Sequence, residues 1–216
     1  AVVNLDGGTL TTAKLYEGAV AVISTNNFNG GILKAVSGTT AGATFMTGLD
    51  CANVRNGGAI IDANGQSITI AQALLHSTIS GDNGIDGGLT TVGNGGGTVT
   101  LTGGNTYTGS TTINGSNTLA IVAPYSTLGS SVLVTNGGRL KVTASTSSSA
   151  LPPITLEDGG GIAFDLGTYN PANVPGITNA NLNVSGTNII DVAGGSFPVA
   201  SITLLAYTNK TGTGVF

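Results

Sequence analysis

Apolar and polar residues alternate with a period of two over much of this chain, in short runs bounded by Gly or Asn. The clearest runs are 99–102, 111–114, 119–122, 132–134, 140–142, 154–156, 182–184 and 202–204. A period of two places successive side chains on opposite faces of a strand. Helical spacing is approached only at 68–76, which is short and opens with strand-like alternation. The pattern therefore predicts an all-β chain built from short strands.

Turn sequences of the form Asn/Asp-Gly-Gly recur along the chain. They begin at Asp6, Asn29, Asn56, Asp86, Asn136 and Asp158, and a related Ala-Gly-Gly occupies 193–195. Gly supplies positive φ without steric cost, and Asn and Asp tolerate the left-handed region better than most residues. The clearest single step between these turns runs from position 136 to position 158. Repeats of about 20 to 30 residues that combine strands and turns indicate a solenoid.

Two all-β architectures compete for this pattern. A β-sandwich would show longer alternating strands joined as hairpins. Short apolar strands with glycine corners at coil length instead favour a right-handed parallel β-helix, or β-solenoid, that forms a single domain over residues 1–216. With about 22 residues in each coil and a rise of about 4.8 Å between coils, the chain would form roughly ten short coils and a rod about 45 Å long.

Residues 87–121 carry the most specific sequence in the chain. Thr98-Val99-Thr100-Leu101 is followed by Gly104-Asn105-Thr106-Tyr107-Thr108-Gly109 and then by Thr111-Thr112-Ile113. This segment resembles the autotransporter-associated β-strand repeat of bacterial passenger domains, and residues 56–70 resemble the coil that often precedes that repeat. Thr91 stands where a Lys is common in the family, and Gly95–Gly97 is one Gly longer than the family pattern. The resemblance implies a rigid extracellular stalk or adhesive passenger, and it carries over no catalytic residues.

The composition supports a folded rod with a polar but weakly charged surface. Gly, Thr, Asn and Ser make up nearly half of the chain, while charged residues are only 7%. A disordered chain this rich in Gly and Ser would be poor in apolar residues, yet here 40% are hydrophobic. A core is therefore expected beneath a surface of Thr, Asn and Ser.

The charge pattern argues against two classes of partner. The net charge is −4, and the basic residues Lys14, Lys34, Arg55, Arg139, Lys141 and Lys210 are scattered. Binding to nucleic acid or to an anionic membrane surface requires clustered Lys and Arg. No run of 18 apolar residues is present, so membrane insertion is not expected either. The chain starts at Ala1, which a removed signal peptide or a cloned fragment would each explain.

Candidate catalytic chemistry is sparse. His76 is the only histidine, so a His-based triad or a zinc site would lack partners. Cys51 has no basic neighbour in sequence and is expected to be a small buried residue. The close acidic pairs are Asp82 with Asp86 and Glu157 with Asp158, and both pairs lie in glycine-rich turns where Asp is common for backbone reasons. We therefore assign no catalytic, cofactor-binding or metal-binding residue and expect no enzyme.

Three weaker binding signals have structural explanations. Residues 81–88 are faintly similar to calcium-binding glycine-rich repeats, which however occur in tandem. The five tyrosines are scattered and are expected to cap coils or to line the core edge rather than to form a sugar-binding row. Thr98, Thr100 and Thr102 lie on one face of one strand, but neighbouring coils are not expected to repeat this row in phase, so ice binding is disfavoured.

The sequence hypothesis is a secreted or cell-surface structural and adhesive rod. Its expected partners are other copies of itself, stacked end to end into filaments, or further coils of a longer passenger, with surface glycans as an additional class. The alternative is a carbohydrate-active or carbohydrate-binding β-helix protein. No cofactor is expected in either case.

Overall fold

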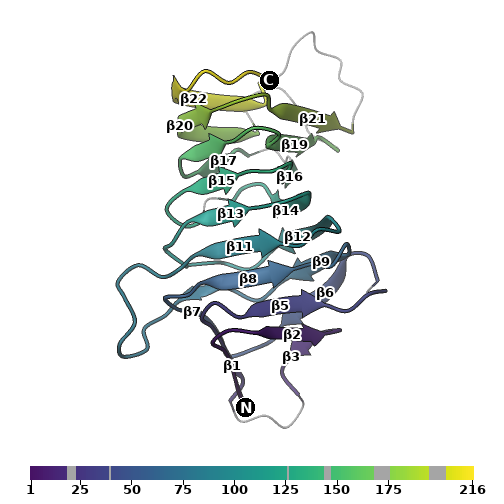
Figure 1. Ribbon diagram of the computed structural model, residues 1–216, viewed down its shortest axis with the longest axis vertical. Coiled ribbons are helices and arrows are strands. Elements are labelled where there is room, and N and C mark those ends of the chain that lie inside the picture. The colour runs from purple at the N-terminus through teal and green to yellow at the C-terminus, as the bar shows by residue number, and fades with distance from the viewer. Residues whose placement is uncertain (19–22, 39, 126, 144–146, 168–175, 195–202) are drawn as a thin grey trace.

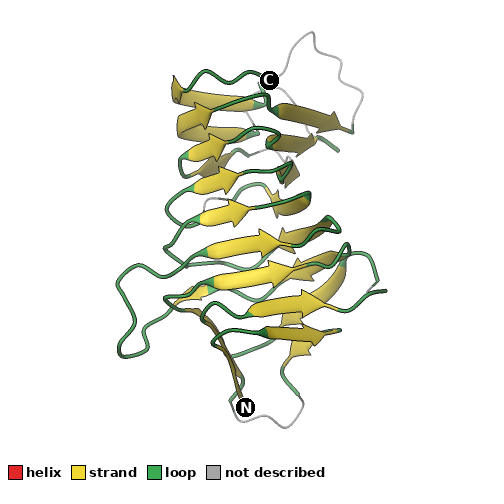
Figure 2. Cartoon of the chain, in the orientation of Figure 1, coloured by secondary structure: helices red, strands yellow, loops and turns green. Residues whose placement is uncertain are grey.

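The computed structural model describes residues 1–18, 23–38, 40–125, 127–143, 147–167, 176–194 and 203–216. Over these residues the regular elements are strands, which stack as a parallel β-solenoid of about seven turns (Figures 1 and 2). The two chain ends lie at opposite ends of the stack (Figure 1). In the part of the chain that is described, no helix is long and apolar enough to cross a membrane. The predicted all-β solenoid is confirmed.

The strands of successive turns form three parallel sheets. Sheet A contains β1 (Val2–Leu5), β4 (Thr25–Phe28), β7 (Cys51–Val54) and β10 (Leu75–His76). Sheet B contains β2 (Thr9–Thr12), β5 (Ile32–Ala35), β8 (Ala59–Asp62), β11 (Leu89–Val92), β13 (Thr111–Ile113), β15 (Val132–Val134), β17 (Ser149–Leu151), β18 (Ile154–Leu156), β20 (Ile177–Val184) and β22 (Leu205–Thr211). Sheet C contains β3 (Leu15–Tyr16), β6 (Ala43–Thr47), β9 (Ser67–Ile70), β12 (Gly97–Leu101), β14 (Asn117–Val122), β16 (Arg139–Thr143), β19 (Gly161–Asp165) and β21 (Ile189–Ala193).

The prediction of roughly ten coils is wrong, because most coils are longer than the glycine-turn spacing suggested. The short coil length holds in the middle of the rod, where Thr111 pairs with Val132. Closer to the N-terminus Ala59 pairs with Leu89, which is a longer step along the chain, because the connection between β10 and β11 is long. About seven turns at a rise of about 4.8 Å correspond to a rod roughly 34 Å long.

Seven of the predicted apolar runs coincide with strands, and the run at 202–204 does not. Ile202 lies outside the described residues, and the strand β22 begins only at Leu205. From there β22 continues through polar residues as far as Thr211, because it pairs with β20 from Ile177↔Leu205 to Asn183↔Thr211. Pairing with the preceding coil, rather than apolar alternation, therefore sets the limits of this strand.

The core is a set of apolar ladders that run along the rod axis. In sheet B the inward positions are Leu33, Ile61, Thr91, Ile113, Val134 and Leu156, which pair in register from one coil to the next. All six side chains are buried. Thr91 is the single polar member of this set, and its Oγ1 is buried without a hydrogen-bond partner. Thr91 therefore occupies a core position, where a charged side chain would be costly.

The glycine turns fall at two different corners of the coil rather than at one. The turns that begin at Asp6, Asn29, Asn56 and Asp86 connect sheet A to sheet B, whereas those at Asn136 and Asp158 connect sheet B to sheet C. The turn at 193–195 ends in a residue outside the described part of the chain. The first corner stacks very closely: a Cβ at Gly57 would lie 2.5 Å from the carbonyl carbon of Asn29. Glycine is therefore required there by contact between coils.

Replacing Thr91 with Val should stabilise the protein. The change keeps the side-chain shape and removes a buried hydroxyl that has no partner, which relieves a cost of about 1–2 kcal/mol. Urea unfolding of both proteins would measure the difference. Thr112→Val, at an outward position on β13 in the next coil, is the matched control and should change stability by no more than about 0.5 kcal/mol. Equal stability of Thr91→Val and the unsubstituted protein would contradict the assignment.

Candidate functional site

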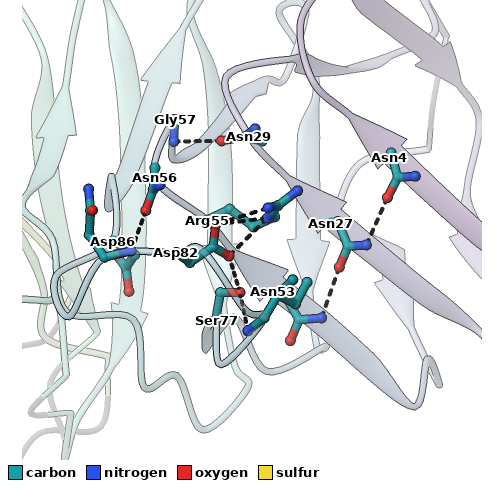
Figure 3. A network of polar contacts seen from close by, with 12 residues as sticks. Asn4, Asn27, Asn29, Asn53, Arg55, Asn56, Gly57, Ser77, Asp82 and Asp86 are labelled. Atoms are coloured by element: carbon teal, nitrogen blue, oxygen red, sulfur yellow. Dashed lines mark hydrogen bonds and ion pairs between the residues drawn. The ribbon is translucent and has the colours of Figure 1, made fainter.

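A polar network occupies the corner between sheets A and B in the N-terminal half of the rod (Figure 3). Its simplest part is an amide ladder formed by Asn4, Asn27 and Asn53 on β1, β4 and β7. The Nδ2 of Asn27 donates to Oδ1 of Asn4 at 2.7 Å, and the Nδ2 of Asn53 donates to Oδ1 of Asn27 at 2.9 Å. Each later coil therefore donates to the earlier one, which gives the ladder a direction.

A second column of side chains fastens the glycine corner beside this ladder. Asn29 donates through Nδ2 to Oδ1 of Asp6 at 2.9 Å, and its own Oδ1 accepts from the backbone N–H of Gly57 at 2.8 Å. One coil further, Oδ1 of Asn56 accepts from the backbone N–H of Asn83 at 2.8 Å. These Asn and Asp side chains therefore hold successive coils together as well as shaping their turns.

Arg55 and Asp82 form the charged centre of the network (Figure 3). Nε and one terminal nitrogen of Arg55 each lie 2.9 Å from a carboxylate oxygen of Asp82, which is a bidentate pair. Ser77 donates its hydroxyl to the same carboxylate at 2.5 Å. The hydrogen bonds from Arg55 and then from Ser77 lower the pKa of Asp82. This pair ties the long connection between β10 and β11 to the coil beneath it.

Asp86 is the most heavily hydrogen-bonded carboxylate of the corner, and its side chain is 1% exposed. Its Oδ1 accepts from the backbone N–H groups of Gly88 and Gly109, both at 2.9 Å. Its Oδ2 lies 2.8 Å from both the N–H of Thr108 and Nδ1 of His76. Burial alone would raise the pKa of Asp86, but the hydrogen bonds outweigh burial and lower it.

The candidate acidic pair Asp82 and Asp86 therefore serves two separate structural contacts. Asp82 is engaged by Arg55 and Ser77, and Asp86 by backbone amides and His76. The lone pairs that a catalytic acid or a calcium ion would use are already occupied in both. Among the described residues, no group of three or more His, Cys, Asp or Glu side chains is placed to hold a metal ion.

The other acidic pair, Glu157 and Asp158, lies in the exposed turn between β18 and β19. Oδ1 of Asp158 accepts the backbone N–H of Thr187 from the next coil at 2.7 Å. This is the same coil-to-coil contact that Asn29 makes with Gly57. Asp158 therefore has a structural role in this turn, because it holds two successive coils together.

The tyrosines and the cysteine occupy unrelated positions. Tyr107 is buried and its hydroxyl lies 2.7 Å from Oγ1 of Thr111, whereas Tyr16 and Tyr207 are exposed near opposite ends of the rod. Tyr169 lies outside the described residues. Cys51 is only partly buried, because it stands at the start of β7 rather than at an inward position. The described tyrosines do not line up as a row.

As expected, neither neighbouring coil repeats the full Thr-x-Thr row of β12, but both repeat part of it in register. Thr98 and Thr100 of β12 pair in register with Ser67 and Thr69 of β9, and Thr98 also pairs with Thr118 of β14. The rows are hidden in the sequence because the coils that carry them differ in length. In β16 the same columns continue as charged residues. The hydroxyl face is therefore a local feature of sheet C that ends at β16.

A pocket of about 340 Å³ opens beside this face, where the chain leaves β12 and β14. Its lining includes Thr102, Gly104 and Asn105 after β12 and Val122 and Tyr125 from β14 and the segment after it. The side chain of Asn105 is buried, and its Oδ1 accepts the backbone N–H of Leu74 at 2.9 Å. Its Nδ2 donates to the hydroxyl of Tyr125. Sequence reasoning missed this pocket, because its two halves lie about one coil apart.

Comparison with protein-family models, with curated proteins and with solved structures finds no match to this chain.

Asp86→Asn should weaken the protein by about 2 kcal/mol at neutral pH, because an amide group would replace an acceptor that faces buried donors. The folded-state pKa of Asp86 is lowered, so its contribution to stability is fully present above the ordinary carboxyl pKa of about 4. It is lost as pH falls through the lower folded-state value. Part of the acid loss of stability should therefore disappear in Asp86→Asn.

Urea unfolding at pH 7 and in the acid range would measure both effects. Asp158→Asn is the matched control, since this exposed carboxylate makes a single backbone contact. An equal effect of the two substitutions would contradict the role assigned to Asp86.

Proposed function

We propose that this chain is a secreted or cell-surface structural rod of the adhesive-passenger type, without enzymatic activity. The observation that carries the proposal is the continuous stacking of parallel coils over a single apolar core, with side-chain ladders that tie neighbouring coils together. Such an arrangement resists bending and presents long, regular outer faces. These are properties of a stalk rather than of an enzyme with a catalytic cleft.

The use of the acidic residues supports this proposal. Each of the eight Asp side chains accepts a hydrogen bond or an ion pair from another part of the protein. The ion pairs Lys141–Asp165 and Arg139–Asp191, at 3.0 Å each, join different coils of sheet C. Glycosidic catalysis would instead require two carboxylates that converge on one open site. We therefore expect the carboxylates to be structural.

The resemblance to the autotransporter-associated repeat also supports the proposal. The resembling segment 87–121 forms β11, β12, β13 and most of β14, which is about one and a half coils. Its Tyr107 is a core residue and its Asn105 binds the backbone of the previous coil. Both side chains therefore have a stacking role in this solenoid, as a repeat of a stalk domain requires.

Both ends of the rod offer surfaces on which further coils could stack. Within the described part of the chain, eight of the eleven exposed large apolar side chains lie at the two ends: Val2, Tyr16, Ile23, Ile189, Val192, Tyr207, Val215 and Phe216. The end strands also present unpaired backbone groups. A separate amide pair at the C-terminal end, in sheet B, has the same direction as the ladder, because Nδ2 of Asn209 donates to Oδ1 of Asn181 in the preceding coil. The coil that continues the stack belongs either to the same polypeptide or to a second copy, which would give a filament.

Concentrated protein of residues 1–216 should form unbranched filaments one rod wide. Negative-stain electron microscopy and sedimentation would detect them. The double substitution Val2→Lys and Tyr207→Lys should suppress the filaments, because buried like charges would face one another or remain unpaired at the junction. Thr112→Lys, on the side of the rod, is the control and should leave them intact. Protein that stays monomeric at every concentration would contradict self-assembly. Further coils could then come only from the same polypeptide.

We also expect no turnover of polysaccharides by this protein. The reason is that Asp82, Asp86 and Asp158 are used in contacts between coils. Incubation with neutral and uronate-containing polysaccharides, followed by reducing-end and unsaturated-product assays, should show no product. Reproducible turnover that is abolished by Asp82→Asn or by Glu157→Gln would overturn this expectation and favour the carbohydrate-active alternative.

A further inference from the structure

We propose that the pocket beside β12 and β14 binds one neutral sugar unit of a surface glycan, an inference that rests on the proposed adhesive function and names its ligand class. The pocket volume of about 340 Å³ falls at the lower end of the range of about 300–1,000 Å³ that is typical of small-molecule sites. A single pyranose ring is a ligand of matching size.

The first argument is the combination of an aromatic ring with apolar walls. Tyr125 is half-buried, packs against the core and lines the pocket, next to Leu101 and the 47% exposed Val122. One side of a sugar ring is made mainly of C–H groups, and it packs well against an aromatic face. Tyr125 can therefore supply the platform on which such a ring lies.

The second argument is the supply of fixed hydrogen-bonding groups. The Asn105 side chain is held by Leu74 and Tyr125, and these contacts use its oxygen and one of its two N–H protons. Its second N–H proton and the hydroxyl proton of Tyr125 make no hydrogen bond inside the described protein. Burial raises the pKa of Tyr125 to about 12, so this hydroxyl keeps its proton at neutral pH. Two oriented donors therefore remain for ligand oxygens.

The third argument is the absence of charge from the lining. The remaining polar groups are the hydroxyls of Thr102 and Thr127 and the backbone of Gly103 and Gly104, and no described lining residue is ionisable at neutral pH. Carboxylate and phosphate ligands are normally held by Arg or Lys. The lining therefore favours a neutral sugar over a uronic acid, a sialic acid or a phosphorylated ligand.

Gly104 offers a way to fill the pocket without disturbing the fold. A Cβ at this position would meet no atom within 4 Å, and its φ lies outside the left-handed region. Gly84, in the long connection between β10 and β11, has the same two properties but does not line the pocket. Gly104→Gln and Gly84→Gln are therefore a matched pair of substitutions, one inside and one outside the proposed site.

The test is a titration of ¹⁵N-labelled protein with methyl β-glucoside, methyl β-galactoside and N-acetylglucosamine, with glucuronate as the anionic comparison. At least one neutral sugar should cause saturable chemical-shift changes at Gly103, Gly104 and the Asn105 side-chain amide. Gly104→Gln should abolish these changes, while Gly84→Gln should retain them with the same dissociation constant. Circular dichroism of both variants confirms that they are folded.

Three outcomes would overturn the site. These are no saturable change with any neutral sugar, saturable changes located elsewhere, or tighter binding of glucuronate than of the neutral sugars. Binding of the unsubstituted protein to glycan-coated beads is measured in parallel. Bead binding that Gly104→Gln leaves unchanged would reject this pocket while keeping the adhesive rod. If Gly104→Gln loses bead binding and Gly84→Gln retains it, the result supports both the sugar site and the adhesive function.

Discussion

In-register stacking of parallel coils is the constraint on which the rest of this structure depends. Strands inside the stack pair with the strand one coil earlier and with the strand one coil later, so their residues lie beside residues that are distant in sequence. Like therefore stacks on like. Val134 lies between Ile113 and Leu156, and Thr98 lies between Ser67 and Thr118. Glycine corners nest so closely that a Cβ would collide with the backbone.

Stacking also explains the chemistry of the surface. Amides and hydroxyls are donors and acceptors at once, so columns such as Asn4–Asn27–Asn53 can be extended without repulsion. A column of identical charges would repel along the whole rod. Charged residues instead occur as opposite pairs between coils, as in Lys34–Asp62 at 2.8 Å. The low charge content of 7% is thus a consequence of the architecture.

Local signals are enough to predict the strands, the turns and the solenoid class. They cannot predict quantities that depend on register. The predicted coil count is too high because the long connection between β10 and β11 lengthens the chain without adding a coil. The hydroxyl rows of β9, β12 and β14 look unrelated in sequence, since the step from Ser67 to Thr98 is much longer than the step from Thr98 to Thr118. Likewise, Asp86 has the pattern of an ordinary turn residue until Thr108 of the next coil is placed against it.

A regular stack has flat faces, so a concave site can form only where the stacking is interrupted. Sheet A ends at β10. In the coils that follow, the segments 102–110 and 123–125 do not form strands of that sheet. The Asn105 side chain replaces part of the missing strand pairing, because its Oδ1 accepts the N–H of Leu74. Its Nδ2 donates to the hydroxyl of Tyr125 one coil further on. The interruption leaves the space beside these two side chains that forms the pocket. The segment that contains Asn105 therefore has two effects: it keeps the coils stacked where sheet A stops, and it opens the surface that we propose as a sugar-binding site.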